Sequence, residues 1–443
     1  MSVDQDNPMA ARAAAILRAN DTGTSIKAAP ALYPHQWSWD AAIVSIGLVH
    51  LSLDRAIQEM RTLFRGQWKN GMLPHIVYSA DVPKDAYFPD ADRWDVAHVS
   101  PDVPEGIATS GIIQPPIHAI AIRRICDQAN PEQARAIASE FYGPLLEWHR
   151  YLVSARDPEV SGLITIVHPW ESGMDNSPRW DQAMARIQVP EGGVPPFERR
   201  DLSHVSDASQ RPTNEDYERF IWIVEVLKRG SYRVDQIYDE LPFRVKDIFM
   251  SAMLVAANEA LIRIAALADG DFDDLTIIES WIDRGRRGLA EQWLPDEGLC
   301  CDLDVIDNSW IKVQTIATFA PLLAGQLTAD TLTALNRVWS SEAFTGHPEL
   351  RWALPPSTSP GEPSFVPNRY WRGPVWPVMN WLLWWAWERI GEGEIAAALR
   401  GNALDQISSA GFAEYVEPFT GEALGSDDQS WTAAVVLDWL AAS

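Results

Sequence analysis

The sequence of 443 residues has little of what several common protein classes require. It has three cysteines (Cys126, Cys300 and Cys301), with no CxxC pair, and adjacent cysteines are poorly placed to join each other, so no disulfide framework is expected. The nine histidines are scattered and form no HExxH motif, and EF-hand, GxSxG and GxGxxG patterns are also missing. We therefore expect neither a metal ion nor a cofactor.

Basic residues are scarce, with 36 Lys and Arg against 61 Asp and Glu and a formal net charge of −25. Nucleic acids and anionic membranes bind clustered Lys and Arg, so neither is expected as a partner. The longest apolar stretch, residues 41–53, is too short to span a membrane and contains His50. No basic segment followed by an apolar one opens the chain, so we expect a cytoplasmic protein. A homo-oligomer is compatible with the sequence.

Tryptophan, in contrast, is abundant, with 21 residues in the chain. Its side chain is large and rigid, and its indole N–H requires a hydrogen-bond partner when it is buried. In an acidic protein, so many indoles favour stacking against the flat apolar faces of sugar rings. Large hydrophobic cores also use tryptophan, and the apolar fraction of 47% is sufficient for such a core. Both uses stay open at this point.

Apolar residues recur at helical spacing along most of the chain, whereas alternating strand patterns are rare. This pattern predicts an all-α protein in which about a dozen helices form hairpins arranged as a toroid. The length of 443 residues alone would allow two or three domains or one large barrel. Two long helix-poor segments, 66–114 and 156–213, are rich in aromatic residues and proline, and we expect them to form walls and lids of an active site. The predicted helices cover residues 40–63, 115–127, 132–153, 215–229, 243–268, 274–293, 309–325, 329–339, 373–391, 393–408 and 428–441.

The stretch HPWESGMDNSPRWD, residues 168–181, has two candidate acids, Glu171 and Asp175. Prolines restrict the backbone at both ends, Gly173 permits a left-handed conformation, and Trp170 supplies an apolar wall. A carboxylic acid beside an indole loses hydration, which raises its pKa and allows it to donate a proton at neutral pH. An ordinary solvated turn is the alternative interpretation.

Three other stretches combine aromatic and polar residues at predicted helix ends. In YPHQWSWDAA, residues 33–42, Asp40 either caps or occupies the first turn of a helix, or lies with Trp37 and Trp39 at the floor of a pocket. In residues 366–387 most indoles are expected in the core, whereas the residues before or at the helix start are better pocket candidates. These pocket candidates are Tyr370, Trp371 and Trp376.

The stretch AEYVEPFTGEALGSDDQSW, residues 413–431, has two carboxylates three positions apart, Glu414 and Glu417. Together with residues 168–181, it gives the chain two acidic loop sites nearly 240 residues apart. Hydrolysis of a glycoside requires such a pair, with one acid to protonate the leaving oxygen and one base or nucleophile opposite.

These motifs resemble glycoside hydrolase family 63. The resemblance is carried by WESGMDNSP at 170–178, RGPVWPVMNWLL at 372–383 and EYVEPFTGEALG from Glu414, and with WSWDAA at 37–42 it spans nearly the whole chain. It implies one catalytic domain over residues 1–443, an (α/α)₆ barrel with long loops that form a cap over the active site, and a reaction with inversion. The compact length is similar to that of the bacterial glucosylglycerate and mannosylglycerate hydrolases of the family.

The resemblance also implies roles for the carboxylates. Asp175 takes the place of the general acid and Glu414 that of the general base, with Glu417 as the competitor for the second role. Asp40 is expected to bind sugar hydroxyls or to help position the water, and Glu171 to orient the loop. In an inverting enzyme the two catalytic carboxyls should lie roughly 6.5–9.5 Å apart, which leaves room for the attacking water.

The remaining expected contacts are to the sugar ring and to the glycerate. Arg211 is the candidate clamp for the glycerate carboxylate, because a guanidinium can bind a carboxylate with two parallel hydrogen bonds. A surface ion pair of Arg211 with Glu215 or Asp216 is the alternative. The expected ring walls are Trp37, Trp39, Trp170, Trp371 and Trp376, the expected hydroxyl ligands are Gln114, Gly173 and Gln429, and the expected phenolic donors are Tyr33, Tyr87 and Tyr217.

The sequence thus predicts an inverting α-glycosidase that acts on glucosylglycerate, with mannosylglycerate close behind, since the two sugars differ only at the 2-hydroxyl. A hydrolase of neutral α-glucosides such as trehalose is the alternative within enzymes. A sugar epimerase on the same toroid, or a carbohydrate-binding protein without activity, fits the sequence less well.

Overall fold

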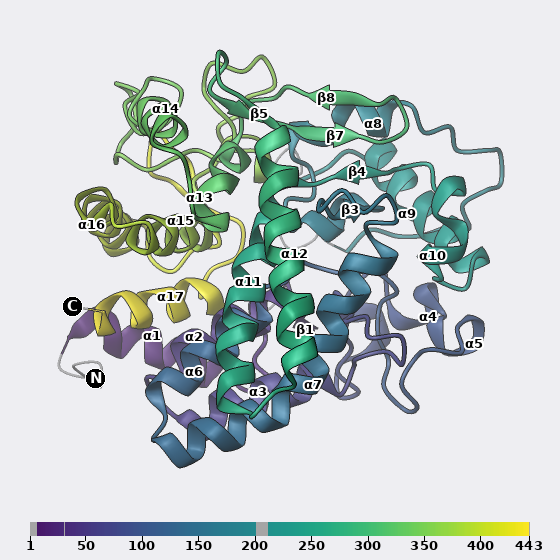
Figure 1. Ribbon diagram of the computed structural model, residues 1–443. Helices are drawn as coiled ribbons and strands as arrows, with labels where there is room; N and C mark the ends of the chain where they lie inside the picture. Colours follow the sequence, from purple (N-terminus) through teal and green to yellow (C-terminus); the bar gives the residue numbers. More distant parts are fainter. Residues whose placement is uncertain (1–6, 31, 201–210, 443) are drawn as a thin grey trace.

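The computed structural model describes residues 7–30, 32–200 and 211–442. Within these residues, twelve helices form a closed (α/α)₆ barrel, as predicted (Figure 1). Six inner helices form a ring in which each contacts the next and the last contacts the first. The inner helices are α2 (Ser38–Leu48), α6 (His118–Gln128), α11 (Ile248–Leu267), α13 (Ala320–Ala324), α15 (Pro377–Arg389) and α17 (Ser430–Ala441).

The inner helices are apolar on nearly every side because they are surrounded by protein. Every residue of α2 is buried, and so are most residues of α11, α15 and α17. By length and composition, α11 is the one helix of the described residues that could cross a membrane, but 83% of its apolar window is buried inside the barrel. Its position in the core therefore explains its composition.

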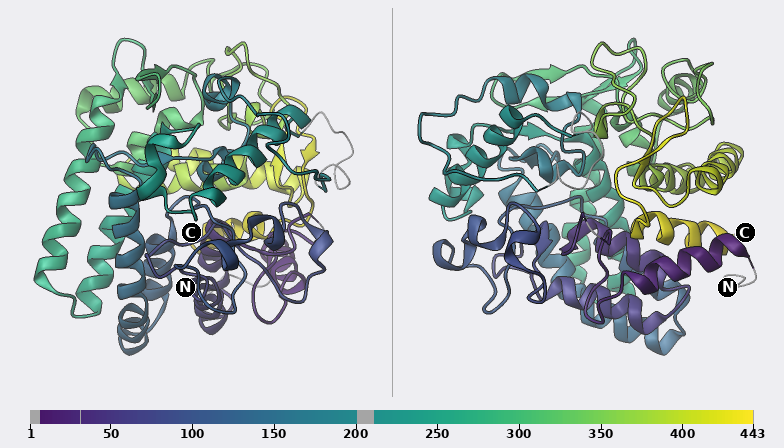
Figure 2. Two further views of the ribbon diagram at one scale, coloured as in Figure 1. Left: turned by 90° about the vertical axis from the view of Figure 1, so that its right-hand side faces the viewer. Right: turned by 180° about the vertical axis from the view of Figure 1, so that it is seen from behind.

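Six outer helices cover this ring. Helix α1 packs on α17, so the first and the last helix of the described chain lie side by side (Figures 1 and 2). Helix α14 packs through Trp339, whose ring lies 5.1 Å from Phe319 and 5.5 Å from Trp387. The outer helices are α1 (Pro8–Ala19), α3 (Leu53–Phe64), α7 (Pro131–Ala155), α12 (Phe272–Glu291), α14 (Ala329–Trp339) and α16 (Gly393–Ala410).

Some helix boundaries differ from the sequence prediction. The predicted helix 40–63 is in fact α2 and α3, because the Ser52 side chain accepts a hydrogen bond from the Arg55 amide and starts a new helix. The predicted helix 243–268 begins only at Ile248, where Asp247 caps the first turn. An apolar period continues across such a cap and does not reveal it.

Two further differences lie at the start and in the last third of the chain. The stretch predicted as a helix over 309–325 is a strand, a 3₁₀ turn (η7, Ile316–Phe319) and the short α13, which ends at Gly325 with φ at +64°. Helix α1 was not predicted, although Asn7 caps it and Pro8 occupies its first turn.

In the described parts of the two helix-poor segments, residues 66–114, 156–200 and 211–213, short helical elements order the chain. Those labelled in Figure 1, α4, α5 and α8, lie with α9 and α10 on one side of the barrel. Large buried side chains, among them Trp94, Trp148 and Tyr232, form a second apolar cluster there. The elements are η1 (Lys84–Ala86), α4 (Ala91–Trp94), α5 (Val96–Val99), η2 (Pro169–Ser172), η3 (Pro178–Trp180), α8 (Asp181–Ala185), α9 (Asn214–Arg229), α10 (Val234–Ile237) and η6 (Tyr238–Glu240).

Short antiparallel strands fasten the loops at the ends of the inner helices. Each has two or three residues, too few for an alternating pattern to be visible in the sequence. Strands β3, β4, β7 and β8 form one sheet, and the others form three pairs, β1 with β2, β5 with β6 and β9 with β10. Their bounds are β1 (Gln36–Trp37), β2 (Ile76–Val77), β3 (Thr165–Ile166), β4 (Val245–Lys246), β5 (Trp293–Leu294), β6 (Leu299–Cys300), β7 (Asp302–Asp304), β8 (Ser309–Ile311), β9 (Tyr415–Val416) and β10 (Ala423–Leu424).

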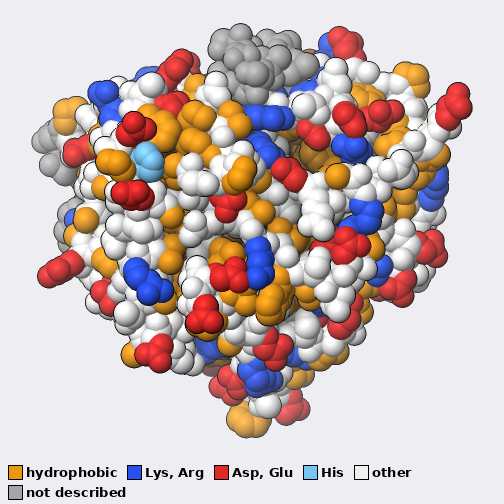
Figure 3. Space-filling view, turned by 90° about the horizontal axis from the view of Figure 1, so that it is seen from above, with side chains coloured by type: hydrophobic (Ala, Val, Ile, Leu, Met, Phe, Trp, Pro, Cys, Tyr) orange, Lys and Arg blue, Asp and Glu red, His pale blue; other side chains and the backbone are white. Residues whose placement is uncertain are grey.

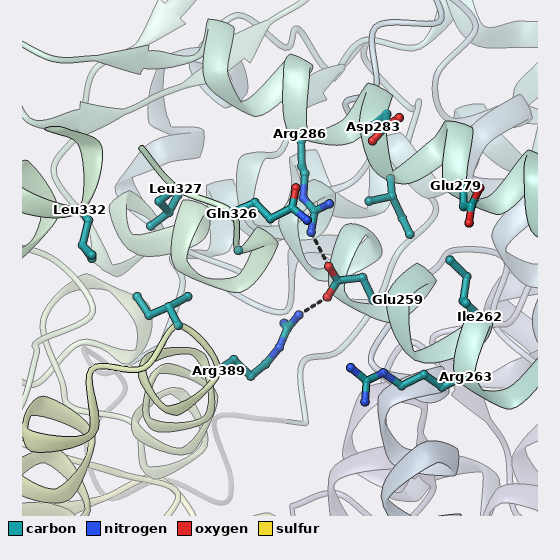
Figure 4. A pocket seen from close by; sticks show the side chains of 13 residues that line it. Glu259, Ile262, Arg263, Glu279, Asp283, Arg286, Gln326, Leu327, Leu332 and Arg389 are labelled. Atoms are coloured by element: carbon teal, nitrogen blue, oxygen red, sulfur yellow. Dashed lines mark hydrogen bonds and ion pairs between the residues drawn. The ribbon is translucent and has the colours of Figure 1, made fainter. Parts of the chain in front are cut away.

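A groove on the outside of the barrel is occupied by an ion-pair cluster. On the face seen in Figure 3, acidic and basic side chains are interspersed. In a groove of about 780 Å³ beside α11, α12 and α15, Glu259 binds both Arg286 and Arg389 (Figure 4). The two guanidinium groups also donate to the carbonyls of Ala324 and Leu323. This cluster ties three helices to the end of α13.

Candidate active site

A smaller cavity, of about 70 Å³, lies where the two helix-poor segments meet the ends of the inner helices. It brings together residues from Tyr33 to Trp431, nearly 400 positions apart in the chain. All site residues predicted from the sequence line it except Trp376. The lining residues are Tyr33, Trp37, Trp39, Asp40, His75, Tyr87, Gln114, Trp170, Gly173, Asp175, Arg211, Pro212, Tyr217, Tyr370, Trp371, Glu414, Gln429 and Trp431.

Asp175 reaches this cavity from a tightly fixed loop. The preceding 3₁₀ turn, η2, ends at Gly173 with φ at +71°, and a Cβ there would lie 3.0 Å from the Trp39 ring, so the position requires glycine. The Met174 carbonyl, directly before Asp175, accepts from the Trp180 indole at 2.9 Å. Directly after Asp175, the Asn176 side chain accepts from the Trp371 amide at 2.9 Å. The chain on both sides of Asp175 is therefore held in place.

Glu171 is directed away from the cavity and into the core. Its two oxygens accept from the Arg156 guanidinium at 2.7 and 2.8 Å, and both side chains are fully buried. They also accept from the backbone amides of Ile113 and Val167. Glu171 therefore orients the loop, in agreement with the prediction, and leaves Asp175 as the only acid of this loop in the cavity.

Glu414 is placed directly before β9 by its pairing with β10. Its Oε1 accepts from the Tyr33 hydroxyl at 2.9 Å, and its Oε2 accepts from the Ser426 amide at 3.0 Å. The competitor, Glu417, instead accepts from the amide and hydroxyl of Thr420 and closes the turn between the two strands. Only Glu414 of this pair lines the cavity.

Asp40 lies in the first turn of α2, whose N-cap is Trp37. The helix dipole favours a carboxylate in this turn, and the same side chain lines the cavity. The two interpretations left open by the sequence are therefore compatible, except that Asp40 is not the cap residue.

Burial raises the pKa of all three cavity carboxyls. The pKa is about 8 for Asp40, where the charge of Glu414 adds to the effect of burial, and about 7 for Asp175, where the charge of Arg211 opposes it. Burial also raises the pKa of Glu414, and Arg211 again opposes the increase, together with the hydrogen bonds from Ser426 and Tyr33. At neutral pH the three groups titrate as a coupled set and are not all charged.

The Arg211 side chain is buried and also lines the cavity. Its Nη2 donates to the Tyr33 hydroxyl at 3.1 Å, and its guanidinium lies 4.5 Å from the centre of the Tyr370 ring. The surface ion pair considered above is wrong, because Arg211 is only 5% exposed. Glu215 pairs instead with Arg219, and Asp216 forms a capping box with Thr213.

Aromatic rings form most of the cavity wall, but Trp376 stands behind it. Its ring is stacked on Trp371 with centroids 3.7 Å apart and an angle of 3°, and its indole donates to the Tyr370 carbonyl. The prediction that Trp376 contacts the ligand is therefore wrong for this structure. Trp376 instead supports the 3₁₀ turn η8 (Tyr370–Arg372), which presents Tyr370 and Trp371 to the cavity.

The amide side chains predicted to hold hydroxyls also line the cavity and make contacts within the protein. Gln114 accepts from the Trp39 amide at 3.2 Å, and Gln429 accepts from the Ser426 hydroxyl at 2.7 Å. Tyr87 packs edge-on against Trp37, with centroids 5.1 Å apart.

Three lining residues were missed by the sequence analysis: His75, Pro212 and Trp431. His75 is stacked against Trp170, with centroids 6.4 Å apart, and its Nδ1 lies 3.2 Å from the Ser110 hydroxyl. Burial lowers the pKa of His75 to about 3, so its ring is neutral. Nothing in the segment LPHIV marks His75, whereas Trp431 lies in a quoted motif and could have been found.

Within the described ranges, no group of three or more His, Cys, Asp and Glu side chains is placed to hold a metal ion. The cavity lining includes three carboxyls, one arginine and several phenols.

The sequence is similar to known proteins over almost its entire length. The family described as mannosylglycerate hydrolase MGH1-like glycoside hydrolase domain matches residues 33–432. The glucosylglycerate hydrolase of Mycolicibacterium hassiacum is 47% identical, over 98% of this chain and 97% of that protein. The mannosylglycerate hydrolase of Thermus thermophilus is 40% identical, over 97% of this chain and 99% of that protein.

A solved structure agrees with this relationship. The crystal structure of the GH63 mannosylglycerate hydrolase from Thermus thermophilus, in complex with Tris and D-glycerate, superimposes with a TM-score of 0.89 at 39% identity. The match covers 98% of this chain and all of the solved one. The chain therefore belongs to glycoside hydrolase family 63, among the mannosylglycerate hydrolase MGH1-like glycoside hydrolases.

Proposed function

We propose that this glycoside hydrolase cleaves the α-glycosidic bond of glucosylglycerate with inversion, and that mannosylglycerate is its second substrate. One observation carries the proposal: Asp175, Glu414 and the buried Arg211 line the same cavity. The first two are the groups that hydrolysis needs, and the third is a partner for a carboxylate. The relative with 47% identity is a glucosylglycerate hydrolase, which supports glucose as the preferred sugar.

In the proposed reaction Asp175 is protonated and donates its proton to the glycosidic oxygen. Glu414 is charged and removes a proton from a water molecule that attacks the anomeric carbon from the opposite face. The pKa of about 7 keeps a large fraction of Asp175 protonated at neutral pH, and the hydrogen bonds from Tyr33 and Ser426 favour the charged form of Glu414. The carboxyl groups are expected to lie roughly 6.5–9.5 Å apart in the complex.

The other lining residues would hold the substrate. Arg211 binds the glycerate carboxylate, with Tyr87 and Tyr217 as additional donors. The indoles of Trp37, Trp39, Trp170 and Trp371 stack on the sugar and exclude water, while Gln114, Gln429 and the backbone at Gly173 bind hydroxyls. Asp40, with its pKa of about 8, is protonated at neutral pH and would hydrogen-bond a sugar hydroxyl or help position the water.

Several coarser expectations belong to the same proposal. The chain acts as a single catalytic domain, with the segments 66–114 and 156–213 as the cap of its active site. It works in the cytoplasm on a small sugar substrate, without nucleic acid or membrane as a partner. Assembly into a homo-oligomer stays a prediction.

The alternative, a hydrolase of neutral α-glucosides such as trehalose, would leave Arg211 without an anionic partner in the substrate. The test is release of glucose or mannose from glucosylglycerate, mannosylglycerate and trehalose, with Asp175→Ala as the control for background hydrolysis. We expect kcat/KM to be highest for glucosylglycerate, and proton NMR to show β-glucose as the first product. Preference for trehalose would contradict the substrate, α-glucose as first product would contradict inversion, and equal turnover by the Asp175→Ala variant would contradict the acid.

A further inference from the structure

A chain of two hydrogen bonds joins the proposed carboxylate clamp to the proposed base. Arg211 Nη2 donates to the Tyr33 hydroxyl at 3.1 Å, and that hydroxyl lies 2.9 Å from Glu414 Oε1, to which it donates. A phenol has a single proton, so the bond to Glu414 uses it and the bond from Arg211 uses a lone pair. The Tyr33 hydroxyl thus links Arg211 to Glu414, in addition to the direct attraction between their charges.

We propose that Tyr33 is a positioning residue that couples the charge of the aglycone to the general base, so that an anionic aglycone favours the chemical step as well as binding. This inference rests on the proposed function. In the empty cavity, the guanidinium of Arg211 polarises the Tyr33 hydroxyl toward Glu414 and strengthens its hydrogen bond to the carboxylate. A substrate carboxylate on Arg211 takes over part of that positive charge, and Glu414 then holds its proton more strongly.

The electrostatics of the cavity support this direction. The charge of Arg211 lowers the pKa of both Asp175 and Glu414, against the effect of burial. When a carboxylate neutralises Arg211, both pKa values rise, which keeps the acid protonated to higher pH and makes the base stronger. His75, the nearby histidine, is neutral because burial lowers its pKa to about 3. The titratable and charged groups that interact with Glu414 are Asp40, Asp175, Arg211, Tyr33, Tyr370 and Tyr415.

A matched pair of substrates isolates the charge: glucosylglycerate and its glyceramide analogue, in which a neutral amide replaces the carboxylate. Single-turnover rates at saturating substrate report the pKa values of the enzyme–substrate complex, whereas kcat/KM reports those of the free enzyme. For the native enzyme we expect both limbs of the single-turnover profile to lie at higher pH with glucosylglycerate than with the amide. An opposite charge within about 4–6 Å shifts the pKa of a carboxyl by about one unit or more, so we expect the acid and amide profiles to differ by about that much. The kcat/KM profiles of the two substrates should coincide.

Two variants locate the coupling. In Tyr33→Phe the difference on the acid limb, which reports Glu414, should shrink because the hydroxyl link is gone. The difference on the alkaline limb, which reports Asp175, should remain, and so should the KM advantage of the acid over the amide, because Arg211 is still present. In Arg211→Met the amide profile should move up to that of the acid, since the charge that separated them is absent. Tyr142→Phe, which removes the hydroxyl of a tyrosine outside the cavity, is the control and should keep the profile difference.

The outcomes separate this inference from the proposed function. Identical single-turnover profiles for acid and amide in the native enzyme would overturn the coupling. A full difference on the acid limb that persists in Tyr33→Phe would overturn the role of Tyr33, and thermal unfolding checks that the variant is folded. If glucosylglycerate is not hydrolysed at all, the proposed function fails instead.

Discussion

The assignment of Asp175 as the general acid is tested by Asp175→Asn with substrates that differ in their leaving group. Asparagine has nearly the same size and cannot donate a proton to the leaving oxygen. The loop should keep its shape, because it is held by the bond from Trp180 to the Met174 carbonyl and by the buried pair of Glu171 and Arg156. The substitution therefore removes the proton and little else.

The size of the expected loss follows from the task of the proton. General acid catalysis contributes about 10²- to 10⁴-fold to a rate. At 1.36 kcal/mol per factor of ten, this corresponds to roughly 2.7–5.5 kcal/mol of transition-state stabilisation. Glycerate leaves poorly as an alkoxide, so kcat for glucosylglycerate should fall by this factor.

The pH dependence supplies a second measure. With a pKa of about 7, Asp175 is half protonated at pH 7 and about one-tenth protonated at pH 8. The kcat/KM of the native enzyme, which reports the free enzyme, should therefore fall about tenfold per pH unit above this pKa. In Asp175→Asn this alkaline limb should disappear, while the acid limb, on which Glu414 becomes protonated, should remain.

The assay compares glucosylglycerate with α-glucosyl fluoride, whose fluoride leaves without protonation. Asp175→Asn should lose far less activity toward the fluoride, whereas Glu414→Gln should lose activity toward both, because each substrate needs the activated water. Equal losses of Asp175→Asn toward both substrates would refute the assignment. So would an alkaline limb that persists in the variant, and Asp40, with its pKa of about 8, would then be the rival acid.

Two further predictions concern the support of the site. Glu171→Gln leaves the buried Arg156 without its counter-charge and should lower the free energy of unfolding by about 3–5 kcal/mol in denaturant titration. Glu297→Gln, from an exposed pair, should change it by less than about 1 kcal/mol, and equal effects would argue against the buried pair. Gly173→Ala, at a φ of +71°, should lower the free energy of unfolding by roughly 1–2 kcal/mol, and it should lower kcat more than it raises KM. Gly143→Ala in α7 should impair neither the stability nor the kinetics.

Much of the barrel and the position of the carboxylates could be predicted from the sequence. The inner helices are buried on all sides, so their apolar runs are long and visible, as in α11 and α15. Asp175 and Glu414 lie close to glycine and proline in the sequence because each is presented on a sharply turned loop. Glycine and proline mark such turns in the sequence itself, so these loops could be found without the structure. The roles assigned to them came from the family resemblance, and they stay predictions until the variants are measured.

Other features depend on three-dimensional contacts that leave no local signal. His75 enters the cavity because β2 pairs with β1, and strands of two residues have no readable period. A tryptophan at a helix start looks the same in the sequence whether its ring faces a ligand or stacks behind another ring. Trp371 and Trp376, which face the cavity and its far side respectively, illustrate this ambiguity.

The charge of the cavity resolves an apparent conflict between this acidic chain and an anionic substrate. The net charge of −25 acts at long range, where salt screens it beyond about 8 Å. Inside the cavity the formal charge is −2, from three carboxyls and Arg211. In the state that the reaction requires, Asp175 is protonated and Asp40, with its pKa of about 8, is neutral as well. The cavity then holds one negative Glu414 and one positive Arg211, so its charges cancel. The protonation state proposed for catalysis is thus one in which a carboxylate meets no net negative charge in the cavity.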